Sequence, residues 1–123
     1  MMSDAWLVTS AGDLVAAERV QKISVGTGTQ SHRVLAQLVA ATGYELLVEF
    51  NWTAKGLFPD RIKSANMAAA RQARLELIVA LDDARRLAKT LNVTHTVSYA
   101  SKEKRWRITN LAKQGINTAI GDV

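Results

Sequence analysis

A run of helix-forming residues between positions 65 and 91 constrains the fold of this chain more than any other feature. Alanine, leucine and arginine fill the interval, and all three favour the helical state. Its small and apolar residues recur at alternating spacings of three and four, which places them on one stripe of a helix. This stripe consists of Ala70, Ala73, Leu77, Ala80, Ala84, Leu87 and Leu91, widened by Leu81 and Ala88. We therefore predict a long amphipathic helix that covers a sheet, with Ser64 as its N-cap and Asn92 at its end.

The middle of the same helix is apolar on a second side. At 100° per residue, Leu75, Ile78 and Val79 point away from the main stripe. One sheet cannot bury both sides, and leaving each of these side chains in water would forgo ~1.5–3 kcal/mol. We expect Leu75, Ile78 and Val79 to form an oligomer interface, most simply that of a symmetric homodimer.

Charged residues follow that apolar segment on the helix. Asp82 is spaced to reach Arg85 and Arg86 at i+3 and i+4, and such pairs contribute only ~0.2–0.5 kcal/mol each. Arg71, Arg85 and Lys89 share part of the helix surface. These groups indicate a solvated, mixed outer face.

Short β-type segments separated by turn signals precede the helix. They cover residues 6–9, 14–15 with 20–25, 34–41 and 44–50. The reversals are expected at residues 11–13, 26–29 and 42–43, each of which contains glycine. The sequence Gly26-Thr27-Gly28 lacks the third glycine of a dinucleotide fingerprint and leads into another strand, so it indicates a hairpin and not a phosphate loop.

A terminal hairpin follows the helix, since residues 93–99 and 105–109 both alternate with period two. Trp106 should face the core, while Arg105 and Arg107 point to the other side. The predicted fold class is therefore α+β, an antiparallel sheet in the order ββββ-α-ββ with one long amphipathic helix packed across one face. We expect residues 1–123 to form a single domain, with a frayed tail at 110–123.

Residues 51–63 show neither period and contain the one proline of the chain. Large apolar side chains make this segment unusual for a solvated connection, so we expect a long apolar loop that folds back over an opening in the sheet or docks on a neighbouring subunit. A pocket beneath it would be lined by Trp52, Phe58, His95 and Tyr99. The alternative is a loop packed on its own core, because most large apolar residues are simply buried.

The formal net charge is +5, and the half of the chain after residue 60 carries the excess. Basic residues cluster around Trp106 in the terminal hairpin, namely Lys102, Lys104, Arg105 and Arg107. Cations beside an aromatic ring are what a phosphate backbone and an unstacked base require, so this is a candidate anion-binding site with nucleic acid as a partner. The alternative is a solubilised hairpin with a core tryptophan.

Several classes of site find little support in the residues. The chain has no cysteine, and its two histidines, His32 and His95, have no ligand spacing around them, so we expect neither a metal nor another cofactor. No glycine-flanked serine marks a nucleophile, which argues against an enzyme. No apolar run approaches the ~20 residues of a membrane helix. We expect no membrane association and a cytoplasmic location.

These observations favour a non-catalytic binding module that acts as a homo-oligomer and contacts an anionic partner. One alternative is a small-molecule-binding protein or enzyme with a pocket under the loop at 51–63. Another is a structural subunit of a larger assembly, in which a different protein covers the outer side of the helix.

Overall fold

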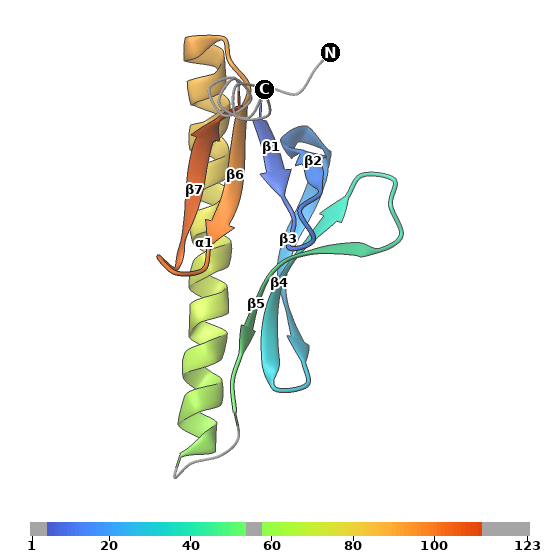
Figure 1. The fold of residues 1–123 in the computed structure, drawn as a ribbon. Coiled ribbons are helices and arrows are strands. Elements are labelled where there is room, and N and C mark those ends of the chain that lie inside the picture. Colours follow the sequence, from blue (N-terminus) through green and yellow to red (C-terminus); the bar gives the residue numbers. More distant parts are fainter. Residues whose placement is uncertain (1–4, 54–57, 112–123) are drawn as a thin grey trace, which may run out of the picture.

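The computed structural model describes residues 5–53 and 58–111. Along the chain the elements are β1 (Ala5–Val8), β2 (Leu14–Ala16), the 3-10 turn η1 (Ala17–Arg19), β3 (Val20–Gly28), β4 (Ser31–Leu38), β5 (Tyr44–Asn51), α1 (Pro59–Leu91), β6 (His95–Ala100) and β7 (Arg105–Asn110). Figure 1 shows α1 standing along one side of the strands. The predicted α+β class and the single long helix packed on strands are confirmed. The expected tail lies outside the described residues beyond position 111.

The strands form two sheets, which corrects the expectation of one antiparallel sheet. A four-stranded sheet has the order β2-β1-β6-β7, and a three-stranded sheet has the order β3-β4-β5. In the first sheet β1 runs parallel to β6, with Leu7 opposite Val97. Turn signals in the sequence indicate hairpins between neighbouring segments. They could not reveal the parallel pairing of β1 with β6, because these two strands are far apart in the sequence. Among the described residues, five strands, and not four, precede the helix.

The three-stranded sheet bends where its register shifts. Between Val34 and Leu35 of β4 the pairing with β5 slips by one residue, so that Leu47 and Val48 are both buried although they are neighbours in sequence. Such a bulge re-aims side chains and breaks strict alternation. This is why the period-two pattern of β5 is weak in the sequence.

The first hairpin of that sheet turns later than predicted. Gly26 and Gly28 lie inside β3, and the reversal falls at Thr29 and Gln30, where Gln30 has a φ of 53°. A Cβ at position 26 would lie 2.9 Å from Cδ1 of Leu35 on the neighbouring strand. Glycine at position 26 thus leaves room for the end of the Leu35 side chain, which a larger residue would displace.

The helix begins at Pro59, five residues before the predicted cap at Ser64. Proline suits the first helical position because its missing N–H would have no partner there. At the other end, Asn92 adopts the left-handed conformation and its N–H bonds to the Ala88 carbonyl, which confirms the predicted end of the helix. The helix therefore includes the last residues of the loop that was predicted at 51–63. Residues 54–57 of that loop lie outside the described part of the chain.

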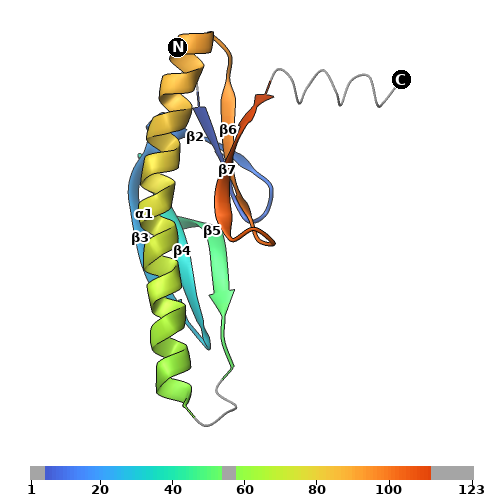
Figure 2. The ribbon, with the colours of Figure 1, turned by 90° about the vertical axis from the view of Figure 1, so that its left-hand side faces the viewer.

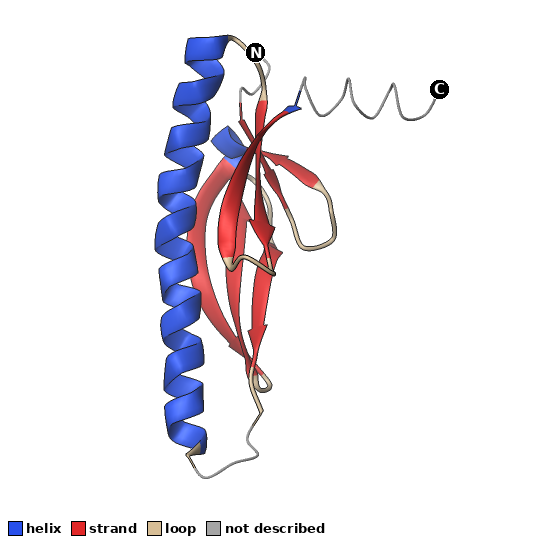
Figure 3. Cartoon of the chain, turned by 60° about the vertical axis from the view of Figure 1, so that its left-hand side comes forward, coloured by secondary structure: helices blue, strands red, loops and turns tan. Residues whose placement is uncertain are grey.

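The core lies between α1 and both sheets, as Figures 2 and 3 show from two further sides. The buried helix residues are Ala70, Ala73, Leu77, Ala80, Leu81, Ala84 and Ala88. Leu87 and Leu91 were predicted to join them, but their side chains are exposed. Figure 1 shows that the C-terminal end of α1 extends past the described strands. No helix in the described ranges is long and apolar enough to cross a membrane.

Candidate functional site

An apolar surface lies on the outer side of α1, formed by Leu75, Ile78 and Val79; we call it the outer patch. These side chains are 53%, 51% and 60% exposed. They lie on the face opposite the buried stripe, as the helical period predicted. Figure 2 views the molecule from the helix side, and no described strand crosses in front of α1. Whether this patch is an interface stays a prediction.

A shallow groove runs along each side of the outer patch. One, of about 590 Å³, lies between the helix and β3 and includes Ile78, Val79 and Ile23. The other, of about 450 Å³, lies between the helix and β7 and includes Leu75 and Ile108. The patch is therefore a ridge between two grooves, a shape onto which the side chains of a second helix can fit.

Charged residues border the outer patch at both ends. Arg71 precedes it and is exposed. Asp82 follows it, and its carboxylate lies 3.0 Å from Nη2 of Arg86, the i+4 pair that the sequence predicted. Both members of that pair are largely exposed, so it contributes little to stability. On this face an arginine precedes the apolar centre and an aspartate follows it, with the basic residues Arg85 and Lys89 further along the helix.

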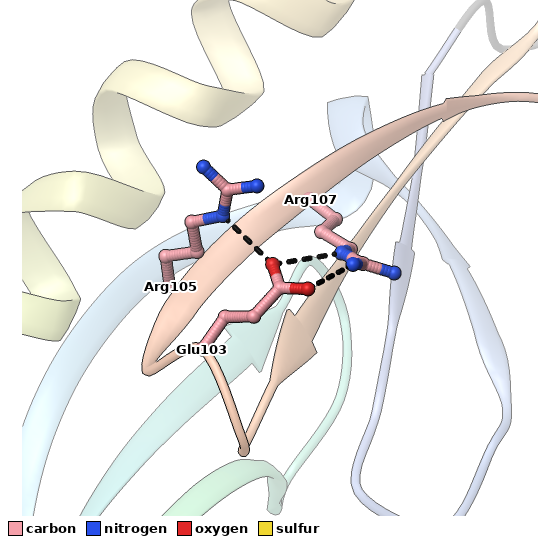
Figure 4. A network of polar contacts seen from close by, with 3 residues as sticks. All are labelled: Glu103, Arg105 and Arg107. Atoms are coloured by element: carbon pink, nitrogen blue, oxygen red, sulfur yellow. Dashed lines mark hydrogen bonds and ion pairs between the residues drawn. The ribbon is translucent and has the colours of Figure 1, made fainter.

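The basic hairpin between β6 and β7 contains its own counter-ion. The Glu103 carboxylate accepts hydrogen bonds from Arg105 Nε at 2.9 Å and from Arg107 Nε at 3.1 Å, with a further contact from Arg107 Nη2 (Figure 4). The hydrogen bonds from Arg107, and then those from Arg105, lower the pKa of Glu103 below its usual range. Lys102 and Lys104 are exposed beside this cluster.

This arrangement bears on the anion-binding hypothesis. Arg105 and Arg107 both direct guanidinium N–H groups at Glu103, so part of their charge is neutralised within the hairpin. Glu103 was not among the residues predicted from the sequence to form this site. An acidic residue enclosed by four basic ones was the signal that could have identified it.

A third feature is a groove of about 780 Å³ between β5, the first half of α1 and the β6–β7 turn, which we call the α1–β5 groove. Its aromatic wall is formed by Phe50, Trp52 and Tyr99. The ring centroids of Phe50 and Tyr99 lie 5.7 Å apart in a T-shaped arrangement. On the helix side the groove is lined by Ala65, Ala69 and Ala73 together with Asn66, Gln72 and Glu76.

Polar groups hold one end of the α1–β5 groove in place. Nδ1 of the fully buried His32 lies 2.6 Å from Oδ1 of Asn66, so His32 donates and the amide oxygen accepts. The Asn66 amide nitrogen donates in turn to the Asn51 carbonyl at 3.3 Å. These contacts tie β4 and β5 to the helix. Among the described residues, Trp52 Nε1 is buried with no hydrogen-bond partner.

Tyr99, in the aromatic wall of the groove, has a perturbed hydroxyl group. Burial of its ring, and then the nearby Glu76 carboxylate, raise the pKa of the Tyr99 hydroxyl above its usual value. Glu76 itself accepts a hydrogen bond from Gln72 at 3.2 Å. Tyr99 therefore remains a neutral hydrogen-bonding group across the physiological pH range.

Two of the four residues predicted to line a pocket lie apart from this groove. Trp52 and Tyr99 line it. Phe58 instead lies at the start of α1, with the guanidinium carbon of Arg61 4.7 Å from its ring centre. His95 is buried at the start of β6, where its Nδ1 donates to the Val93 carbonyl at 2.8 Å. That bond gives His95 a structural role.

Sequence reasoning missed Asn66 and Gln72 as groove residues. Their polar side chains lie beside the buried stripe, and only the position of β5 shows that they face a groove. Within residues 5–53 and 58–111, no group of three or more His, Cys, Asp or Glu side chains is placed to hold a metal ion. Comparison of the chain with protein-family models, with curated proteins and with solved structures found no match.

Proposed function

We propose that this chain is a non-catalytic binding module that acts as a homodimer, joined through the outer patch of α1. The observation that carries the proposal is the exposure of Leu75, Ile78 and Val79 side by side at the centre of a helix whose other face is already packed. Three adjacent, half-exposed branched side chains are typical of an interaction surface.

Two features favour a second copy of the chain over another class of partner. The charges at the two ends of the patch are opposite, which makes the surface complementary to itself, as a two-fold interface requires. A nucleic acid would be bound through cations that are free to neutralise its phosphates, whereas Glu103 already pairs with two of the four cations in the hairpin. The anionic partner therefore stays a prediction from the sequence.

Replacing Ile78 by lysine should abolish the dimer. Two-fold symmetry places one Ile78 from each subunit in the interface, and full burial of each contributes ~1.5–3 kcal/mol. The dissociation constant of the Ile78→Lys variant should rise at least about 100-fold. Sedimentation velocity over a dilution series measures this, with the unmodified chain expected near twice its 13.4 kDa mass.

Leu91→Lys is the matched control, since Leu91 lies on the same helix with a similar exposed fraction of 54% but outside the outer patch. It should leave the dissociation constant within about threefold, because a surface charge distant from an interface changes affinity little. A monomeric unmodified chain at micromolar concentration, or an Ile78→Lys protein that remains dimeric, would refute the proposal.

Ligand binding in the α1–β5 groove is a second candidate function. The observation in its favour is that Phe50, Trp52 and Tyr99 meet polar side chains from the helix in one concave surface, which is the usual composition of a small-molecule site. Leu75, Ile78 and Val79 do not line this groove, so separate substitutions can test the two candidate functions.

The fluorescent probe 8-anilinonaphthalene-1-sulfonate tests the groove directly. We expect saturable binding to the folded chain, and Ala69→Phe should weaken it about tenfold, which corresponds to ~1.4 kcal/mol, because the added ring fills the groove from the helix side. Thr90→Phe, an exposed position near the end of α1, serves as the control. Equal binding by the Ala69→Phe variant and the unmodified protein would exclude the groove as the binding site.

A further inference from the structure

The outer face of α1 carries a second regular spacing besides its buried stripe. Residues spaced alternately by four and three form a single line along it, namely Ser64, Ala68, Arg71, Leu75, Ile78, Asp82, Arg85 and Lys89. All eight are exposed. This is the spacing of the seam between two helices of a coiled coil. Its two central members are apolar, and the next members on either side carry opposite charges.

From this pattern we infer an antiparallel pairing of α1 with α1 of a second copy, in one specific register. In that register Leu75 lies opposite Ile78 of the partner subunit, and Arg71 lies opposite Asp82 of the partner subunit. The two-fold axis passes between positions 75 and 78, so each contact occurs twice. This inference rests on the proposed homodimer and adds to it the orientation, the register and the residues that select them.

The charges discriminate against the parallel arrangement. A parallel pair aligns each residue with its own copy, which would place Arg71 against Arg71 and Asp82 against Asp82 of the partner subunit. Like charges facing each other oppose association. The antiparallel arrangement turns both of these repulsive contacts into attractive ones.

The apolar residues at the centre of the seam also disfavour other antiparallel registers, in which one helix is shifted along the other. A shift of seven residues in one direction would place Leu75 opposite Arg71 of the partner subunit, and a shift in the other direction would place it opposite Arg85. Either register exposes apolar area and leaves an arginine without an acidic group to face. One register therefore satisfies both the apolar and the charged positions.

The rest of the fold leaves room for this pairing. In Figure 3 the described strands lie to one side of α1. Val79 lies beside the seam and lines the grooves next to both β3 and β7, where it can extend the apolar contact. The Asp82 carboxylate accepts one contact from Arg86 and has further lone pairs for a second guanidinium.

A charge exchange tests the register. Arg71→Glu should raise the dimer dissociation constant about tenfold, because it places one glutamate carboxylate against Asp82 of the partner subunit on each side of the axis. Asp82→Lys should do the same by pairing two cations. The double variant Arg71→Glu/Asp82→Lys restores opposite charges and should return the dissociation constant to within about threefold of the unmodified protein.

Asp83→Lys is the matched control, since Asp83 is an exposed neighbour of the same type that lies off the seam. Alone it should leave the dissociation constant unchanged, and it should not rescue Arg71→Glu. Rescue by Asp83→Lys in place of Asp82→Lys would mean a different register and would overturn the inference.

Cross-linking tests the orientation, and the absence of native cysteine makes any introduced thiol unique. A mixture of the Arg71→Cys and Asp82→Cys proteins should form a disulfide-linked dimer under mild oxidation, while each variant alone should not, because its two thiols would lie ~16 Å apart along the helix axis. Self-linking of either variant would indicate parallel helices and refute the inference.

These experiments distinguish failure of the proposed homodimer from failure of the proposed register. If the unmodified chain sediments as a monomer, the proposal of a homodimer is wrong. If it is a dimer without the charge rescue or the mixed cross-link, only the register fails.

Discussion

Replacing Trp106 by alanine is expected to lower the free energy of unfolding by about 3–5 kcal/mol. The indole is 8% exposed, and its Nε1–H donates to the Ala73 carbonyl of α1 at 2.8 Å. The same ring packs against Tyr99 with a centroid separation of 5.1 Å. Removing it leaves a cavity at the junction of β7 with the helix and deletes a buried hydrogen bond. Urea denaturation followed by circular dichroism measures the loss.

Two further variants separate the contributions in this experiment. Trp106→Phe keeps an aromatic ring but removes the N–H donor, so it should cost less than the alanine variant, roughly 1–3 kcal/mol. Tyr44→Ala removes an aromatic side chain that is largely exposed on β5, and its effect should stay within about 0.5 kcal/mol. A Trp106→Ala protein as stable as Tyr44→Ala would show that Trp106 does not join the helix to the terminal hairpin.

Leu77→Ala should destabilise the fold by about 2–5 kcal/mol. Leu77 is fully buried, and it lies in the middle of the stripe by which α1 packs on both sheets. Because Leu77 faces the core, the variant should leave the outer patch intact. Its dimer dissociation constant should therefore stay close to that of the unmodified protein under conditions where both are folded.

Leu91→Ala provides the comparison at the end of the same helix. Its side chain is exposed, so truncation should cost no more than about 0.5 kcal/mol. All variants must be compared at one protein concentration, because dimerisation makes the apparent stability depend on it. Equal losses for Leu77→Ala and Leu91→Ala would contradict the described packing of α1.

A candidate surface could be predicted from the sequence where its residues belong to one secondary-structure element. It could not be predicted where residues from several elements come together. Leu75, Ile78 and Val79 were identified because the helical period alone decides that they oppose the buried stripe. The same reasoning could not group Trp52 and Tyr99 with Asn66, since these residues come from β5, β6 and α1. It also could not separate His95 from them, because the face of a strand does not tell which neighbour covers it.

The sequence by itself determined the long helix, its end at Asn92, most of its buried stripe and the outer patch. These properties follow from propensity and spacing within one continuous segment. It also indicated the terminal hairpin and the opposite directions of Trp106 and Arg107, which the register of β6 and β7 confirms. All of these interactions lie close together along the chain.

Only the tertiary structure decided that the strands divide into two sheets and that β1 pairs with β6 in parallel. Backbone hydrogen bonds between strands are chemically the same for every pair of strands. The residues of one strand therefore do not specify which strand from a distant part of the sequence pairs with it. The pairing of the strands is compatible with the packing of α1, which buries its stripe against both sheets. The α1–β5 groove results from that packing, which is why it could not be derived from any single segment.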